Sequence, residues 1–186
     1  MNDTRRLHAL VCEDDALLAL DLEHQLKTLG YCVIGPFASQ SAALRAALAS
    51  ADIVVMSGGT SKGAFFRLDD LPAACQGPGP ARDRLLQRVI GSPDPYAAHI
   101  DGLGGATSST SKVVLVSKSQ RPDCDVDYLF GAVAIDKPVV DWSGNCGNLS
   151  AAVGPCAIAM GLIDAARVPQ DGVAVIRIWQ ANIGKT

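Results

Sequence analysis

The sequence lacks the patterns that mark membrane, secreted and zinc-binding proteins. No stretch approaches the roughly 18 consecutive apolar residues of a membrane-spanning helix. The N-terminal MNDTRRLHAL has no long apolar core of the kind that a secretory signal needs. The six cysteines show no CxxC spacing and no partnering histidine cluster, which disfavours a disulfide framework and a zinc site. We therefore expect a cytoplasmic protein, away from membranes, whose cysteines are free thiols.

An excess of positive charge is also missing. The chain has 16 Lys and Arg residues against 19 Asp and Glu residues, for a net charge of -3. Without a basic face, binding to nucleic acid is not expected. The hydrophobic share of 48% over 186 residues is enough to bury one good core or two small ones. The composition therefore predicts a folded globular protein.

The charge balance and amino-acid composition of the chain change near residue 56. Residues 1–56 carry four Lys and Arg residues against seven Asp and Glu residues, whereas residues 57–186 carry twelve of each kind. No glutamate follows Glu23, and glycine and serine crowd the second segment. We therefore expect two units, residues 1–56 and residues 57–186.

The first segment alternates between strand and helix patterns. An apolar run over 7–12 ends in Glu13 and Asp14, which is typical of a buried parallel strand with polar side chains at its carboxyl end. Leucines at helical spacing over 18–29, followed by a glycine, predict a helix. Strand patterns at 31–34 and 52–56 and a short helix pattern at 41–48 complete a β-α-β-α-β order.

Within residues 7–56, one segment resembles the first part of a bacterial response-regulator receiver domain, with the sequence LVCEDDALLALDLEHQLKTLGYCVIGPFAS. The resemblance implies a Mg²⁺ site at Glu13 and Asp14. Two carboxylates alone make a weak metal site, and the alternative is a solvated strand end. Ser57 stands where the family has its phosphate-accepting aspartate. Because a serine cannot form the acyl phosphate, we expect no phosphotransfer.

The second segment combines small-residue loops with one strongly apolar stretch. Clusters such as GGTSKG and DGLGGATSSTSK let backbone amides approach an anion, so several of them together predict an anion-binding cleft. Residues 148–160 are apolar on every side, which predicts a central helix buried all round, with Pro155 kinking it. Such a helix needs a sheet wrapped around it, for which strand patterns lie at 65–68, 113–117, 132–135 and 173–179.

Cys146 immediately precedes that predicted helix, between an asparagine and a glycine. At a helix N-terminus the dipole and the free amides lower the pKa of a thiol and attract a carboxylate. A cysteine in so apolar a chain is otherwise a small core residue, and Cys156 is expected to be one. Cys146 is therefore predicted as an acid or base.

The blocks GGTSKG, RVIGSPDPY, DGLGGATSSTSK, DVDYLFG, DWSGNCGNL and RIWQANIGKT closely resemble the PrpF family of 2-methylaconitate cis-trans isomerases, from about residue 56 to residue 186. The resemblance implies a mixed α/β (α+β) fold, in which this part is a diaminopimelate epimerase-like half-domain with its sheet wrapped around a central helix. It also implies isomerisation of a tricarboxylate of the methylcitrate route, without a metal or an organic cofactor.

The resemblance also implies roles for particular residues. Lys112, which ends ATSSTSK, corresponds to the acid/base residue of the family, and Cys146 faces the same cleft. A lysine desolvated in such a cleft can lose its proton near neutral pH and remove a γ-proton from an unsaturated acid. The residues that would hold the carboxylates of the substrate are Gly104, Gly105, Ser108, Ser109, Asn145, Gly147, Asn148 and Lys62.

Two departures from the family keep other interpretations open. Ser57 stands where the family has an arginine that could bind a carboxylate through two hydrogen bonds. The family also continues beyond IGKT into a second domain that closes the cleft. We therefore expect an exposed cleft surface that could support self-association, and activity of the chain alone stays open. The alternatives are a receiver-type signalling or binding module without phosphotransfer, and a recombination product whose halves share no function.

Overall fold

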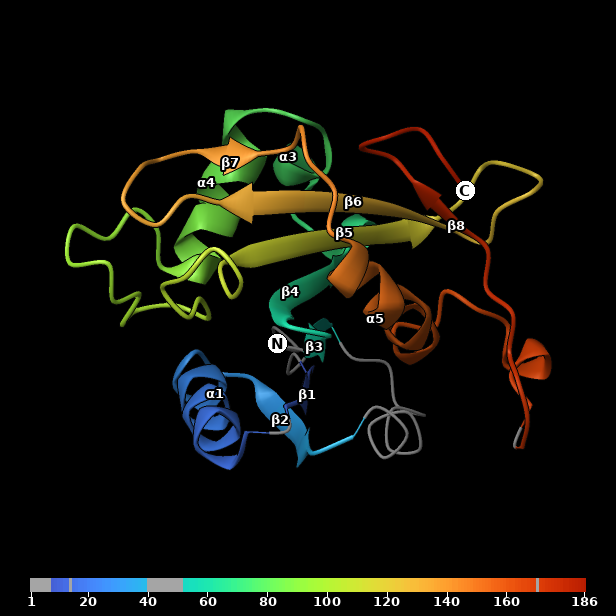
Figure 1. Ribbon diagram of the computed structural model, residues 1–186, viewed down its shortest axis with the longest axis horizontal. Helices are drawn as coiled ribbons and strands as arrows, with labels where there is room; N and C mark the ends of the chain where they lie inside the picture. Colours follow the sequence, from blue (N-terminus) through green and yellow to red (C-terminus); the bar gives the residue numbers. More distant parts are fainter. Residues whose placement is uncertain (1–7, 14, 40–51, 170) are drawn as a thin grey trace, which may run out of the picture.

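The computed structural model describes residues 8–13, 15–39, 52–169 and 171–186 (Figure 1). Within them the strands form an eight-stranded sheet of order β2-β1-β3-β4-β5-β6-β7, with β8 paired to β6. The strands are β1 (His8–Cys12), β2 (Cys32–Phe37), β3 (Ile53–Gly58), β4 (Ser61–Arg67), β5 (Lys112–Lys118), β6 (Val126–Val133), β7 (Val140–Asp141) and β8 (Ile178–Gln180). The helices are α1 (Ala16–Thr28), α3 (Ala73–Gln76), α4 (Pro80–Ile90) and α5 (Gly147–Ala159), with short 3₁₀ turns at Leu68–Asp70 and Ala165–Arg167.

The strands and the helix predicted in the first segment are confirmed where the structure describes them. The carboxylate of Asp15 caps α1 by accepting hydrogen bonds from the N–H groups of Leu17 and Leu18, and the helix buries Leu22 and Leu26. Strand β1 pairs in parallel with β2 on one side and with β3 on the other. The helix predicted at 41–48 lies outside the described residues.

Strand β3 crosses the boundary that the sequence predicts at residue 56. Its first residues pair in parallel with β1, and the whole strand pairs antiparallel with β4. The β1-α1-β2 unit is therefore an extension of the same sheet that the second segment builds. Ile53 and Val55, which are fully buried, carry the apolar core across this junction.

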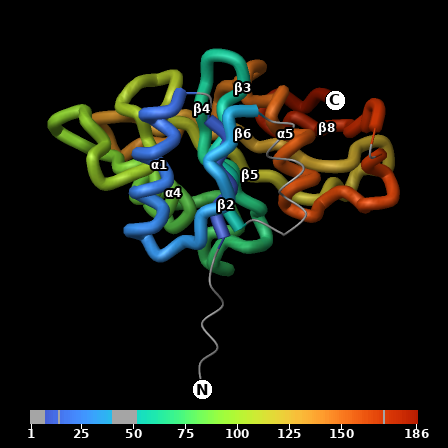
Figure 2. The backbone as a smooth tube through the Cα atoms, turned by 90° about the horizontal axis from the view of Figure 1, so that it is seen from below, coloured from blue at the N-terminus to red at the C-terminus, as the bar shows by residue number. Residues whose placement is uncertain are grey.

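Two hydrophobic cores lie on the two faces of the sheet. Side chains of α5 pack on one face with Val54, Met56 and Phe65, whereas α1 and α4 cover the other face over Val55 and Phe66. Figure 2 shows α1 and α4 on one side of the strands and α5 on the other. Because successive strand residues point to opposite faces, the register of each strand decides which core a side chain enters.

Several strand limits in the second segment differ from those predicted. Strand β4 begins at Ser61, not at residue 65, because small residues that resemble a loop are buried there in a hairpin. Strand β6 covers 126–133, so the strand predicted at 132–135 is only its end. The strand predicted at 173–179 is limited to β8, and α4 was not predicted at all.

The central helix was predicted with nearly the right limits, but it is not buried all round. Leu149 and Ala152 are fully buried, whereas Ala151 is exposed and Pro155 is half-buried within the continuous helix. The reason is that the sheet contacts only one side of α5, through β3, β4 and β6. The other side borders a cavity of about 390 Å³. In the described parts of the chain, no helix is long and apolar enough to cross a membrane.

Candidate functional site

Lys112 and Cys146 meet where β5 begins next to the N-terminus of α5. Lys112 shares its face of β5 with Val114, which packs in the core around α5, and Cys146 is the N-cap residue of that helix. Lys112 Nζ lies 3.5 Å from Cys146 Sγ. The structure therefore brings together the two residues that the sequence predicts as acid and base.

Ser61 completes this cluster and was missed in the sequence. Lys112 Nζ donates a hydrogen bond of 2.8 Å to Ser61 Oγ, and Cys146 Sγ lies 3.7 Å from the same oxygen. Ser61 is only 4% exposed and begins β4. Its position follows from the pairing of Gly63 with Lys112, which places the alternate residue Ser61 on the same face as the lysine.

The environment of Cys146 favours its thiolate form. Burial alone would raise the pKa of the thiol, but the amide of Leu149, the hydroxyl of Ser61 and the positive charge of Lys112 together lower it below its usual value. By contrast, complete burial raises the pKa of Cys156 well above the usual value. Cys156 is thus the core residue that the sequence predicts, and Cys146 stays the candidate for reactivity.

Tyr128 fixes the backbone at Cys146. Its hydroxyl donates a hydrogen bond of 3.0 Å to the Cys146 carbonyl, and its ring is fully buried under α5. Burial, reinforced by the neighbouring thiolate charge, raises the pKa of Tyr128, so the phenol remains a hydrogen-bond donor at neutral pH. This contact orients the residue that carries the thiol.

The β3–β4 hairpin packs directly against the first turn of α5. A Cβ atom placed on Gly58 would lie 2.2 Å from the Asn148 carbonyl oxygen, so only glycine permits this approach. Asn148 Nδ2 donates to Thr60 Oγ1 at 3.0 Å, and Asn145 Nδ2 donates to Gln180 Oε1 on β8. With Gly147 beginning the helix, these three predicted binding residues lie beside Cys146.

Lys62 lies on the opposite face of the sheet from Lys112. It pairs across the hairpin with Ser57 and is 4% exposed. Burial lowers the pKa of Lys62, although the negative charge of Glu13 opposes this shift. A cavity of about 330 Å³ there is lined by Lys62, Gly104 and Gly105 together with residues of α1.

The loop that holds the predicted binding residues Ser108 and Ser109 is hydrogen-bonded to the backbone of Lys62. The Ser109 carbonyl accepts a hydrogen bond of 3.0 Å from the Lys62 N–H, and Ser108 is exposed in the same loop. The predicted set of binding residues is thus divided. Asn145, Gly147 and Asn148 accompany the Lys112–Cys146 pair, whereas Gly104 and Gly105 lie beside Lys62.

Glu13 is held inside the protein at the end of β1. It is 7% exposed and accepts hydrogen bonds from Ser57 Oγ at 2.9 Å and from the Asp15 N–H at 3.2 Å. It is therefore not the solvated strand end that the sequence left as an alternative. Asp14 lies outside the described residues. Across the described ranges, no group of three or more His, Cys, Asp or Glu side chains could hold a metal ion.

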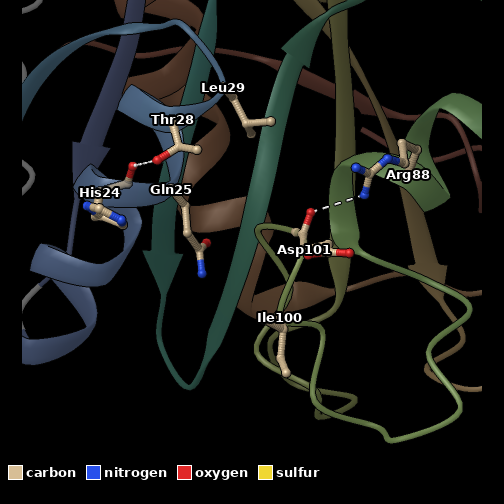
Figure 3. A pocket seen from close by; sticks show the side chains of 8 residues that line it. His24, Gln25, Thr28, Leu29, Arg88, Ile100 and Asp101 are labelled. Carbon is tan, nitrogen blue, oxygen red and sulfur yellow. Dashed lines mark hydrogen bonds between the residues drawn. The ribbon is translucent and has the colours of Figure 1, made fainter.

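A separate cavity of about 310 Å³, which none of Lys112, Cys146 and Lys62 lines, lies between α1 and the 100–102 loop (Figure 3). Arg88 Nη1 donates to the Asp101 carbonyl at 3.2 Å on one side of it, and Gln25 of α1 and Leu29, which follows that helix, face it from the other. Because the direct contact between an amine and a thiol lies outside this cavity, we place the candidate site at the Lys112–Cys146 pair.

The lowered pKa of Cys146 predicts selective alkylation. With its thiolate present at a lower pH than an ordinary thiol requires, Cys146 should react with iodoacetamide at a lower pH than an ordinary cysteine, whereas Cys156 should stay unmodified. Lys112→Ala should move the reaction of Cys146 to higher pH. Peptide mass spectrometry over a pH series measures both effects, and an ordinary thiol profile at Cys146 would contradict them.

Comparison with known proteins identifies relatives of most of the chain. A 2-methyl-aconitate isomerase from Cupriavidus necator is 76% identical over 129 residues, which cover 69% of this chain and 33% of that protein. A 2-methyl-aconitate isomerase from Shewanella oneidensis is 74% identical over 131 residues, 70% of this chain and 33% of that protein. A 4-oxalomesaconate tautomerase from Pseudomonas putida is 52% identical over 132 residues, 71% of this chain and 34% of that protein.

A solved structure supports the same relationship. The crystal structure of a methylitaconate-delta-isomerase superposes with a TM-score of 0.62 at 44% sequence identity, covering 72% of this chain and 55% of that one. The mixed α/β fold is therefore shared with that isomerase. The chain spans about a third of the length of the curated relatives named above. The family profile described as "PrpF protein" matches residues 49–186, and the chain therefore belongs to the PrpF family.

Proposed function

We propose that this chain carries the acid/base centre of an isomerase of the methylcitrate route, which acts on 2-methylaconitate or aconitate. The observation that carries the proposal is the 3.5 Å contact between Lys112 Nζ and Cys146 Sγ at the N-terminus of α5. Relatives that are 76% and 74% identical bear the name 2-methyl-aconitate isomerase. Their similarity supports this substrate class for the present chain.

The pair can perform a proton transfer in which every proton is returned. Lys112 and Cys146 share one proton across their contact. When that proton is on Cys146, the Lys112 amine removes the γ-proton of the unsaturated acid, which gives a dienolate whose former double bond can rotate. Cys146 then donates a proton to the same carbon, and the proton passes back from Lys112 to the thiolate across their contact. No net proton is consumed, and no cofactor is needed for these steps.

The N-terminus of α5 is the part of this centre best suited to the carboxylates of the substrate. The first amides of the helix carry the positive end of its dipole and have no partner within the helix. Gly147 begins the helix with open space around its Cα, so a ligand can approach the backbone closely. Asn145 and Asn148 flank it with side-chain amides that can reorient toward the ligand.

The test uses the 186-residue chain itself. Isomerisation of trans-aconitate and of 2-methylaconitate is followed by ultraviolet absorbance, and binding is followed by titrating the chain with each acid under NMR observation. We expect saturable binding that shifts signals at the start of α5, together with turnover above that of Lys112→Ala. Absence of both binding and turnover would overturn the proposal.

We further propose that residues 7–56 derive from a receiver domain and act as a binding segment without phosphotransfer. The parallel strand order β2-β1-β3 is that of the receiver and flavodoxin type of sheet, which supports the proposal. Ser57 binds Glu13 where a receiver would carry its reactive aspartate. Incubation with acetyl phosphate should therefore leave the mass of the chain, measured by mass spectrometry, unchanged. Detection of an aspartyl phosphate would refute the absence of phosphotransfer.

A further inference from the structure

Residues 173–177 lie between the 3₁₀ turn at Ala165–Arg167 and β8, and they approach β8 from beyond the end of the sheet (Figure 1). Strand β8 pairs in parallel with β6, starting from Val126 opposite Ile178. The contact extends by one residue beyond that ladder, because the Arg177 carbonyl accepts a hydrogen bond of 2.8 Å from the Asp125 N–H. On its other side this segment has no neighbouring strand among the described residues.

Alternate backbone groups of this segment are left unpaired. The Arg177 N–H donates to Asp125 Oδ2 at 2.7 Å, and the Val175 carbonyl accepts from Arg167 Nη2 at 3.3 Å, so these odd-numbered residues direct their polar groups toward the Arg167–Asp125 ion pair. In an extended chain the even-numbered residues must then direct theirs outward. In the part of the chain that the structure describes, the N–H and C=O groups of Ala174 and Ile176 have no partner.

The side chains of the same segment are apolar on both faces. Val173 and Val175 are 86% and 67% exposed. Ala174 and Ile176 instead line the cavity of about 390 Å³ against the open side of α5. This is the pattern of a strand covered on both faces, and it explains why the sequence predicts a strand from residue 173. The unpaired backbone groups and the exposed valines together form what we call the open edge, residues 173–177.

We propose that the open edge pairs antiparallel with the open edge of a second copy of this chain, about a twofold axis at Val175. In that register Ala174 of each copy lies opposite Ile176 of the other, and each such pair exchanges two hydrogen bonds. The unpaired backbone groups of both copies are thereby satisfied. The exposed valines of the two copies pack together on one face.

Charge complementarity favours a second copy over an unrelated strand. The apolar stretch is flanked by Asp171 on one side and by Arg177 on the other, in the order DGVAVIR. Antiparallel pairing about Val175 places Arg177 of each copy diagonally across from Asp171 of the other, within reach of an arginine side chain. A parallel arrangement would instead bring like charges together.

Sedimentation of the 186-residue chain over a concentration series tests this proposal. We expect the apparent mass to rise from one chain to two chains with concentration. Val175→Glu should hold the mass at one chain, because two carboxylates would face each other at the axis, whereas the matched control Val139→Glu should not. Val139 is suitable because it is also exposed, at 51%, but lies between β6 and β7.

Three further variants separate loss of pairing from loss of folding. Ala174→Pro removes an outward N–H and should also give single chains, with an unchanged circular dichroism spectrum as the check on folding. Asp171→Lys should weaken association, and adding Arg177→Glu should restore it. Single chains at every concentration, or pairs that persist in Val175→Glu, would overturn the proposal, as would equal sensitivity to Val139→Glu.

Discussion

Replacing Lys112 by alanine should lower the rate of aconitate isomerisation by about 10²–10⁴-fold, the range expected for a general acid/base residue. Lys112 Nζ contacts both Ser61 Oγ and Cys146 Sγ, so the change removes the amine that exchanges protons with the thiol. Initial rates from ultraviolet absorbance at saturating substrate measure the effect. Substrate binding should weaken far less, since the helix N-terminus and its amides remain.

The same strand offers a matched control for this variant. Lys118 ends β5, is exposed, and lies at the other end of the strand from the candidate site. Lys118→Ala should therefore keep the rate of the unaltered chain. If Lys112→Ala retained a rate within severalfold of Lys118→Ala, the acid/base role of Lys112 would have to be abandoned.

Replacing Gly58 by alanine should reduce the free energy of unfolding by about 3 kcal/mol, as overpacking at a rigid contact does. The added Cβ would lie 2.2 Å from the Asn148 carbonyl oxygen and 3.0 Å from its carbonyl carbon. Both are backbone atoms of α5, which cannot move without shifting the helix. Urea denaturation followed by circular dichroism measures the change.

Gly147→Ala provides the control on the other side of this contact. A Cβ at Gly147 meets no atom within 4 Å, so alanine there should leave the denaturation midpoint nearly unchanged or raise it slightly. Equal midpoints for the Gly58 and Gly147 variants would mean that the hairpin does not pack on α5 as described. A displaced α5 should also increase the separation of Cys146 from Lys112, which couples this stability defect to loss of activity.

The features that the sequence predicted well are those with a strong local pattern. The regular leucines and the acidic cap residue define α1, and the apolar stretch after Cys146 defines α5. The signals for α4 are equally local, with a glycine before Pro80 at its start and Gly91 at its end, where the structure has a left-handed conformation. That helix could therefore have been found without a structure.

The features that the sequence could not supply depend on contacts between distant segments. Nothing local shows that α5 has an open side, because the apolar pattern is the same on all its faces. The contact between Lys112 and Cys146 depends on the packing of β5 against the start of α5, and only the family resemblance pointed to it. Ser61 was missed because the strand that it begins resembles a loop in composition.

The hairpin between β3 and β4 also constrains how the sequence can change. Only Gly59 and Thr60 separate the paired residues Gly58 and Ser61. If one residue were inserted there and the later pairing moved by one position, Ser61 and Lys62 would exchange faces. A buried amine would then replace the hydroxyl beside Cys146. Natural variants of this turn should therefore differ in the identity of its residues while its length stays constant.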